Sequence, residues 1–173
     1  MLNFKKLRKK NIVLIGLMGS GKSAVGREIA KSLNFDFYDS DAEIEKRIGK
    51  SIKQIFQTKG EEFFRLLEEE ICLELLENKN CVIALGGGSI INKRIRSLIN
   101  LNSFSIYLKV DIEVLLNRLR NSNKRPLLSL GNKKIILEDI YNQRKNYYKK
   151  ANLIIVNNTS KESVVKNIIK ELS

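Results

Sequence analysis

Hydrophobic and polar residues follow two alternating patterns along this 173-residue chain. Two runs are apolar throughout and rich in β-branched residues: NIVLIG at 11–16 and CVIAL at 81–85. Such runs are typical of strands buried on both faces of a sheet. Similar but more mixed runs at 35–38, 103–110 and 153–156 predict three further strands.

In the segments between and after these strands, apolar residues recur at the spacing of a helix. Ser40 and Glu43 have the spacing of a capping box, Asp111 is placed to cap a later helix, and Gly60 is expected to separate two helices. The predicted helices cover residues 22–33, 40–48, 51–58, 61–77, 92–99, 111–120, 133–150 and 161–172.

Strands that alternate with helices predict an α/β fold, with a five-stranded parallel sheet flanked by helices. The length favours a single domain over residues 1–173. The polar stretch 121–134 interrupts the alternation and contains the only proline, Pro126. Loops of this length inside compact domains are commonly functional lids, and we expect a mobile lid here.

The composition limits the classes of function. Lys and Arg number 32 against 19 Asp and Glu, a net charge of +13, which would suit nucleic acid or anionic small molecules. Arginine–glycine repeats and interleaved aromatic and basic residues are absent, so nucleic acid is not the expected partner. The chain has no histidine, which excludes catalysis by histidine and metal sites built from it.

The two cysteines and the N-terminal region bear on location. Cys72 and Cys81 stand alone in apolar segments, as buried reduced thiols of a cytosolic protein do. The basic stretch FKKLRKK precedes an apolar run, but that run is short and leads directly into a glycine-rich loop, so we do not expect a signal peptide. No stretch is long enough to cross a bilayer. We expect a cytoplasmic monomer without membrane contact.

GLMGSGKS at 16–23 fits the phosphate-loop pattern G-x-x-x-x-G-K-[ST], between a predicted strand and a predicted helix. Backbone N–H groups and the helix N-terminus bind phosphate oxygens, Lys22 reaches the transferred phosphate, and the Ser23 hydroxyl can ligate Mg²⁺. No NKxD base-reading motif follows, and the third strand ends in glycines instead of an acidic pair, so a small-molecule kinase is favoured. The expected ATP-binding residues are Gly19, Ser20, Gly21, Lys22, Ser23 and Ala24.

The chain resembles the shikimate kinase family along nearly its whole length. The segments that carry the resemblance occur in the family's order: GLMGSGKSAVG, FYDSDAEIE, IFQTKGEEFFRLLE, ALGGGS, RPLL and LEDIYNQRKNYYKKA. The resemblance implies a P-loop kinase fold. It also implies transfer of the ATP γ-phosphate to the 3-hydroxyl of shikimate, with Mg²⁺ as cofactor, in the pathway to chorismate and aromatic amino acids.

The resemblance also implies roles for two acids that follow the second strand. Asp41 would contact the hydroxyls of shikimate and orient or deprotonate the attacking one, while Asp39 would lie near the magnesium ion. Without the resemblance, acids in a first helical turn are explained by the helix dipole alone.

The remaining shikimate contacts are expected from a helical region at about 40–70 and from later segments. Arg65 and Arg144 would bind the carboxylate of shikimate. Without the resemblance, Arg65 would belong to an exposed ladder of ion pairs on its helix, and Arg144 would lie on a basic, solvent-exposed helix face. The acids of the ladder are Glu61, Glu62, Glu68 and Glu69. Gly86, Gly87 and Gly88 would let the ring lie against backbone, with Gly87 donating an N–H.

In the predicted lid, Arg125 would close over the ATP phosphates as a catalytic residue. A contact to adenine falls within 157–161 without a single candidate, and the basic segment 1–10 has no assigned role. Two rival functions stay open: another small-metabolite kinase, such as gluconate kinase, and a basic NTPase that binds nucleic acid.

Overall fold

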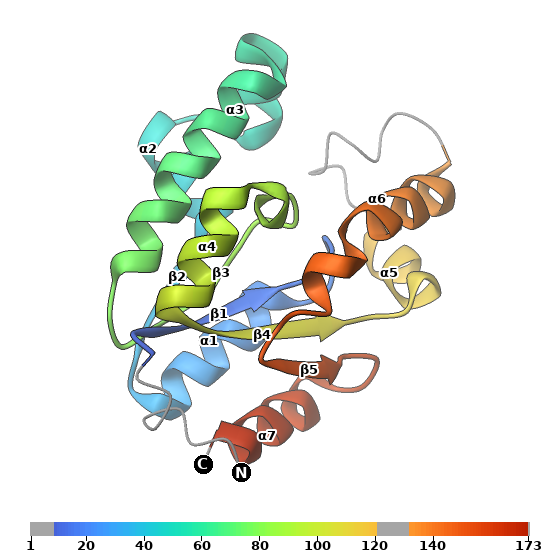
Figure 1. Cartoon of the computed structure of the whole chain (residues 1–173). Helices are drawn as coiled ribbons and strands as arrows, with labels where there is room; N and C mark the ends of the chain where they lie inside the picture. The colour runs from blue at the N-terminus through green and yellow to red at the C-terminus, as the bar shows by residue number, and fades with distance from the viewer. Residues whose placement is uncertain (1–8, 121–131, 173) are drawn as a thin grey trace.

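Helices cover both faces of a five-stranded parallel sheet in the computed structural model of this chain (Figure 1). The structure describes residues 9–120 and 132–172. The strand order is β2-β3-β1-β4-β5, and all four neighbouring pairs are parallel, which confirms the predicted fold class. The strands are β1 (Asn11–Ile15), β2 (Asp36–Asp39), β3 (Cys81–Ala84), β4 (Ser103–Lys109) and β5 (Leu153–Val156).

The central strand β1 shows why the apolar runs are continuous. Ile12 and Leu14 point into a core cluster with Val25 of helix α1 and Ile168 of helix α7. Val13 and Ile15 belong to a second core cluster on the opposite face. Both faces of the strand are therefore buried, as the unbroken apolar run predicted.

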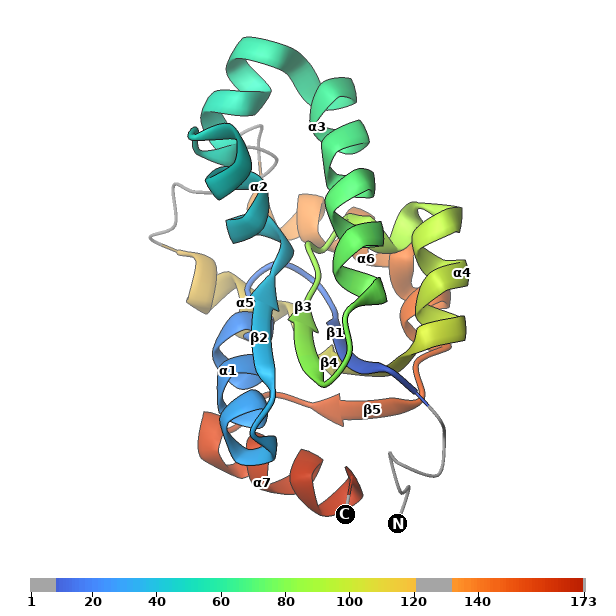
Figure 2. The ribbon, with the colours of Figure 1, turned by 90° about the vertical axis from the view of Figure 1, so that its left-hand side faces the viewer.

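The helices lie in two layers. Helices α1 (Lys22–Leu33) and α7 (Lys161–Leu172) pack on one face of the sheet. The other face is covered by helices that contribute to the second cluster, and Figure 2 shows α2 and the adjoining part of α3 extending beyond the end of β2. These are α2 (Ser40–Ile48), α3 (Ile52–Glu77), α4 (Lys93–Asn102), α5 (Ile112–Leu119) and α6 (Lys133–Tyr148), with the 3₁₀ turn η2 (Ser89–Ile91) before α4.

Helix α3 contains the break that was expected at Gly60. The residue has φ +82° and ψ 173°, so two helical segments meet there at a kink. Glycine adopts this left-handed φ without the cost that a Cβ imposes. The kink separates the segment that begins at Ile52 from the longer segment that contains Arg65.

One predicted helix cap was wrong, and a second was right in position but lacks the side-chain hydrogen bond to its helix. Helix α2 is capped by Asp39, whose Oδ1 accepts from the N–H groups of Asp41 (3.0 Å) and Ala42 (3.4 Å). Ser40 is the first helical residue, and its hydroxyl instead accepts from the Gly86 N–H at 2.8 Å. Asp111 does occupy the N-cap of α5, but its carboxylate accepts from Asn158 Nδ2 instead of from its own helix.

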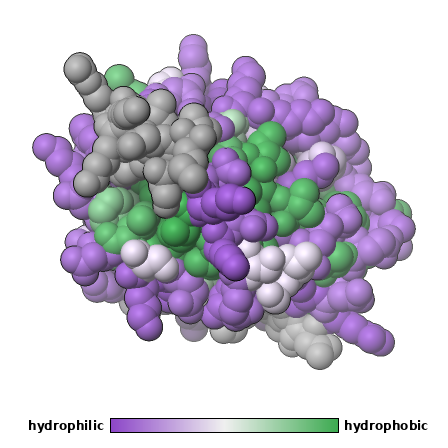
Figure 3. Space-filling view, turned by 90° about the horizontal axis from the view of Figure 1, so that it is seen from below, coloured by the Kyte–Doolittle hydropathy of each residue, from purple (hydrophilic) through white to green (hydrophobic). Residues whose placement is uncertain are grey.

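The face shown in Figure 3 is mainly polar, with a hydrophobic band across its middle. Ile154 and Val156 are exposed on β5, which is an edge strand of the sheet. In the described ranges, no helix is long and apolar enough to span a membrane. Cys72 and Cys81 are free and buried, as expected. Most of the predicted lid, residues 121–131, lies outside the described residues.

Candidate active site

The phosphate loop joins the end of β1 to the start of α1. Gly19 (φ +77°) and Gly21 (φ +87°) have left-handed backbone, which allows the chain to turn tightly before the helix. The first turn of α1 contains no acidic residue that would offset its positive potential. Lys22 Nζ donates to the carbonyl oxygens of Gly16 and Leu17, at 2.9 Å each, so its ammonium lies over the loop.

A cavity of about 310 Å³ opens over this loop. It brings Lys22 and Ser23 together with Asp39, the last residue of β2, and with Asp41, which follows shortly after it. The cavity thus lies at the carboxyl ends of the strands, where ligands bind in open α/β folds. Gly87 reaches the same cavity from the loop after β3. We call this space the phosphate cavity. Its lining is Met18, Gly19, Gly21, Lys22, Ser23, Ala24, Asp39, Asp41, Ala84, Leu85, Gly87 and Arg118.

Asp39 does more than cap a helix. Its Oδ1 caps α2, while its Oδ2 accepts a hydrogen bond from the Ser23 hydroxyl at the start of α1. This contact places a hydroxyl and a carboxylate side by side at the edge of the phosphate cavity. Oxygen donors of this kind suit Mg²⁺, which is commonly held by one or two protein groups together with substrate phosphates. No cluster of three or more His, Cys, Asp or Glu occurs in the described part of the chain, so a cage of protein ligands is not formed there.

Two further residues support the phosphate loop, and sequence reasoning missed their roles. Arg118, near the end of α5, lines the phosphate cavity and donates from Nη2 to the Asn157 carbonyl at 2.9 Å. Asn157 is buried, and its Nδ2 donates to the Ser20 carbonyl at 2.7 Å. In the sequence, the only sign of a role for Arg118 was its positive charge close to the predicted lid. Asn157 lies in the segment expected to contact adenine, where the structure assigns it a contact with the loop backbone.

The glycine triplet follows β3 and lies against three functional side chains. None of Gly86, Gly87 and Gly88 has a positive φ, so the reason for glycine is space. A Cβ on Gly86 would lie 2.7 Å from Asp41 Oδ1 and 2.9 Å from Glu68 Oε1. A Cβ on Gly88 would lie 2.4 Å from Arg65 Nη1. The triplet thus allows an acid and an arginine to approach the backbone closely.

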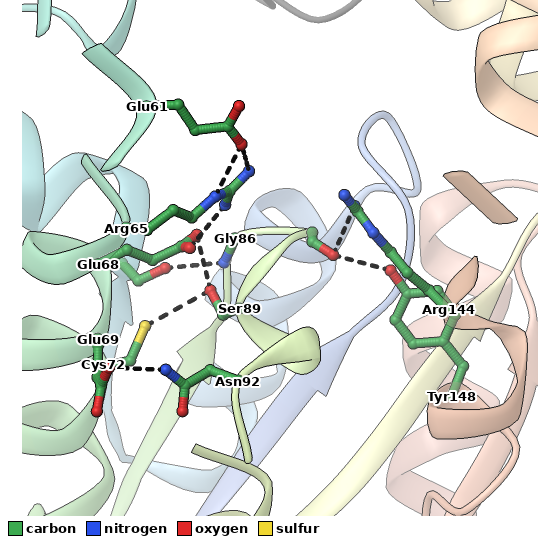
Figure 4. A network of polar contacts seen from close by, with 12 residues as sticks. Glu61, Arg65, Glu68, Glu69, Cys72, Gly86, Ser89, Asn92, Arg144 and Tyr148 are labelled. Carbon is green, nitrogen blue, oxygen red and sulfur yellow. Dashed lines mark hydrogen bonds and ion pairs between the residues drawn. The ribbon is translucent and has the colours of Figure 1, made fainter. Parts of the chain in front are cut away.

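Arg65 is held between two carboxylates of its own helix (Figure 4). Nε and Nη2 donate to Glu61 Oε1 at 3.2 and 3.0 Å, and Nη1 donates to Glu68 Oε2 at 2.7 Å. Burial lowers the pKa of Arg65, but its pairing with Glu68 and Glu61 outweighs this and raises the pKa overall. The ion-pair ladder considered from the sequence thus forms in part, with Glu61 and Glu68, while Glu69 pairs with Arg94. Arg65 also lines the cavity described below.

Glu68 is a buried acid that sequence reasoning took for one rung of that ladder. Only 4% of the residue is exposed, and burial raises the pKa of its carboxyl, with a further rise from nearby Asp41. The ion pair with Arg65 and a hydrogen bond from Ser89 act in the opposite direction. Its burial results from packing against the glycine triplet, which no local pattern reports.

Arg144 on α6 approaches the triplet from the opposite side (Figure 4). It is only 4% exposed, and its Nη1 donates to the Gly87 carbonyl at 2.8 Å. The hydroxyl of Tyr148 donates to the same carbonyl at 3.0 Å. Arg144 Nε is buried and has no hydrogen-bond partner among the described residues. The competing interpretation of Arg144 as part of a solvent-exposed basic helix face is therefore wrong.

A second cavity, which we call the acceptor cavity, lies between Arg65 and Arg144 and holds about 60 Å³. It continues into a groove of about 650 Å³, the side groove, which shares Arg65, Glu68, Gly88 and Arg144 with it. Asp41 lines both the acceptor cavity and the phosphate cavity. The lining of the acceptor cavity is Met18, Asp41, Ile52, Phe56, Phe64, Arg65, Glu68, Gly86, Gly87, Gly88 and Arg144.

This arrangement joins two sites through one carboxylate. A loop suited to polyphosphate lies on one side of Asp41, and a cavity with two arginines lies on the other. The acceptor cavity suits a molecule with an apolar body and an anionic group, because it combines aromatic and aliphatic side chains with guanidinium groups. All the predicted site residues except Arg125 are in the described ranges, and they line these two cavities or, for Ser20, support the loop. Arg125 lies outside the described residues.

Comparison with known proteins agrees with this geometry. The family model for shikimate kinase matches residues 18–173. A shikimate kinase from Bartonella quintana (strain Toulouse) is 44% identical over 169 residues, which cover 96% of this chain and 80% of that protein. The solved structure of a shikimate kinase from Acinetobacter baumannii in complex with shikimate superposes with a TM-score of 0.90 at 34% identity, covering 96% of this chain and 94% of that one.

A gluconokinase from Sinorhizobium meliloti 1021 shares the fold alone, with a TM-score of 0.63 at 16% identity over 95% of this chain and 92% of that one. The family match spans both cavities and the residues that line them. The chain therefore belongs to the shikimate kinase family of ATP-dependent kinases.

Proposed function

We propose that this enzyme transfers the γ-phosphate of ATP to the 3-hydroxyl of shikimate, within aromatic amino acid biosynthesis. The observation that carries the proposal is the position of Asp41, which lines the phosphate cavity and the acceptor cavity at once. A hydroxyl held at Asp41 faces the phosphate loop, while the rest of its molecule extends toward Arg65 and Arg144.

The donor binds over the phosphate loop. Backbone N–H groups of Gly19, Ser20 and Gly21 and those at the start of α1 face the ATP phosphates, and Lys22 supplies a cation for the transferred group. Lys22 exchanges its contacts with the Gly16 and Leu17 carbonyls for the phosphate oxygens. This donor set fixes the phosphates relative to Asp41.

Mg²⁺ would be held by Ser23 and Asp39, whose oxygens already lie side by side. In that position the ion would help to neutralise the charge of the ATP phosphates. Its contribution to affinity is measured by titrating ATP with and without Mg²⁺, in the wild type and in Asp39→Asn. The proposal requires that Asp39→Asn removes most of the Mg²⁺ dependence.

The acceptor is held by its carboxylate. Arg65 and Arg144 approach the glycine triplet from opposite sides, so an anionic group between them receives guanidinium donors from both. Ligand pockets usually enclose about 300–1,000 Å³. The acceptor cavity holds about 60 Å³ and the adjoining side groove about 650 Å³, so a six-membered ring uses the space where the two meet.

In the chemical step, the 3-hydroxyl oxygen attacks the γ-phosphorus and the bond to the β–γ bridging oxygen breaks. ADP leaves with that bond's electron pair, and the hydroxyl proton passes to the Asp41 carboxylate. Phosphoryl transfer requires little covalent help from the protein, so orientation of the hydroxyl and stabilisation of the phosphate charge supply most of the acceleration.

A coupled ADP-release assay with shikimate, quinate and gluconate tests the proposal. Shikimate should support turnover far above the other two acceptors. Faster turnover with gluconate would favour the rival small-metabolite kinase. A parallel gel-shift assay at physiological salt, with and without shikimate, tests the rival NTPase. That rival requires tight binding of nucleic acid that shikimate does not change. The closing role of Arg125, the cytoplasmic location, the monomeric state and the single domain over 1–173 stay predictions.

A further inference from the structure

Ser89 occupies the point where the glycine triplet meets helix α3. It is the first residue of η2, directly after Gly88, and only 1% of it is exposed. Its hydroxyl lies 3.0 Å from Glu68 Oε1, to which it donates. A single buried hydroxyl therefore connects the loop after β3 to the helix that carries Arg65 (Figure 4).

The neighbours of this hydroxyl fix the direction of its proton. Cys72 Sγ lies 3.6 Å from Ser89 Oγ and donates to it. Burial raises the pKa of the Cys72 thiol to about 12, so the thiol keeps its proton at neutral pH. Because the oxygen of Ser89 already accepts from Cys72, its own proton is directed toward Glu68.

The chain of contacts ends at the acceptor cavity. One carboxylate oxygen of Glu68 accepts a hydrogen bond from the Ser89 hydroxyl, and the other accepts from Arg65 Nη1 at 2.7 Å. Both oxygens are therefore hydrogen-bonded. Arg65 is partly exposed, with 32% of its side chain accessible, whereas the Glu68 side chain is 5% exposed. The buried acid is the rigid partner of the pair and sets the position of the guanidinium.

We propose that Ser89 is a positioning residue for acceptor binding: its hydroxyl fixes the Glu68 carboxylate in the orientation that presents Arg65 to the acceptor. This inference rests on the proposed function, because it takes the acceptor to be a carboxylate bound by Arg65. Ser89 lines neither the acceptor cavity, nor the side groove, nor the phosphate cavity, and its hydroxyl donates to Glu68, so its effect is transmitted through Glu68.

The expected effect is confined to one substrate. A hydrogen bond of this kind contributes about 0.5–1.5 kcal/mol, which corresponds to roughly a two- to tenfold loss of shikimate affinity in Ser89→Ala. The KM for ATP and the kcat at saturating shikimate should stay close to the wild type. Ser89→Thr and Ser89→Val have nearly the same shape and differ in the hydroxyl, so Thr should bind shikimate more tightly than Val.

Calorimetric titration with shikimate measures the effect, together with kcat and both KM values and a thermal unfolding curve for each variant. Ser103→Ala is the matched control, since Ser103 is also buried and its hydroxyl has no partner in the described ranges. Its shikimate affinity should equal that of the wild type. In an Arg65→Ala background, Ser89→Ala should cause no further loss, because the residue through which it acts is absent.

Three results would overturn the inference. The first is wild-type shikimate affinity in Ser89→Ala, and the second is the same loss in the Arg65→Ala background as in the wild type. The third is unfolding of both the Ala and Val variants while Thr folds, which would make the hydroxyl a structural requirement. Failure of the proposed function is distinguishable, because then the wild type itself would not bind shikimate in the same titration.

Discussion

Replacing Arg144 by methionine should weaken shikimate binding without lowering the stability of the fold. Arg144 is 4% exposed, and its guanidinium forms no ion pair with any described carboxylate. It donates at 2.8 Å to the Gly87 carbonyl, which also accepts from Tyr148 at 3.0 Å, and it interacts with the Tyr148 hydroxyl itself. The free enzyme therefore holds a buried cation that neutral groups, and no described carboxylate, compensate.

Without shikimate, the free-energy terms predict that Arg144→Met is at least as stable as the wild type. Burial of a charge costs several kcal/mol, while a hydrogen bond from a charged group returns about 1.5–3 kcal/mol. Methionine is unbranched and fills much of the space of the arginine stem. We expect the free energy of unfolding of Arg144→Met to equal or exceed that of the wild type.

Shikimate binding should change in the opposite direction. Loss of one charge-assisted contact weakens affinity by roughly ten- to a hundredfold. At shikimate one hundred times the wild-type Kd, the wild type gains about 2.7 kcal/mol of stability. A variant with a hundredfold weaker Kd gains only about 0.4 kcal/mol at that concentration.

Urea unfolding with and without shikimate, together with calorimetric titration, measures both effects. Lys145→Met is the control, because Lys145 lies on the same helix and its Nζ contacts only Asn142 Oδ1, at 2.9 Å, among the described residues. That variant should keep wild-type shikimate affinity. The reasoning is refuted if free Arg144→Met loses more than about 2 kcal/mol of stability and still binds shikimate normally.

Three further substitutions test the donor and acceptor sites. Lys22→Met should lower turnover by about two or more orders of magnitude in the coupled assay, because the transferred phosphate loses its nearest cation; turnover within a few-fold of wild type would remove the phosphate-loop assignment. Asp41→Asn should retain fold and ATP affinity but nearly abolish phosphorylation, and equal activity would leave Asp41 only its role in the first turn of α2. Gly88→Ala should displace Arg65, whose Nη1 would lie 2.4 Å from the new Cβ, and weaken shikimate binding at least about tenfold. Gly49→Ala adds a Cβ with no atom within 4 Å but strains the backbone at φ +69°, so it controls for lost stability without a displaced arginine; equal shikimate affinity in the two variants would contradict the close approach.

Local patterns were sufficient for most of the fold. The continuous apolar runs of β1 and β3 predicted strands buried on both faces, and Gly60 marked the break in α3. Each of these signals depends on burial or backbone conformation that a few adjacent residues determine. The Ser40 cap failed because the carboxylate one residue earlier, on Asp39, reached the helix N–H groups, which left the Ser40 hydroxyl for Gly86.

The site was predictable where a motif spans adjacent residues, as in the phosphate loop. Glu68, Tyr148 and Arg118 were missed as parts of the site because their roles arise from contacts between distant segments. Glu68 meets Ser89 across 21 residues, and Tyr148 meets Gly87 across 61. Helical spacing alone described Glu68 as a surface acid, and only the packing of α3 against the glycine triplet makes it a buried one.

The most direct test of the central claim is the position of phosphate in the product. Incubation of the wild-type enzyme with ATP, Mg²⁺ and shikimate, followed by proton–phosphorus correlated NMR, identifies the oxygen that carries the transferred group. The hydroxyl held at Asp41 is taken to be the 3-hydroxyl, so phosphorus should couple to the proton on carbon 3, and Asp41→Asn should give almost no product. Phosphate on another oxygen, or undiminished product in Asp41→Asn, would contradict the account.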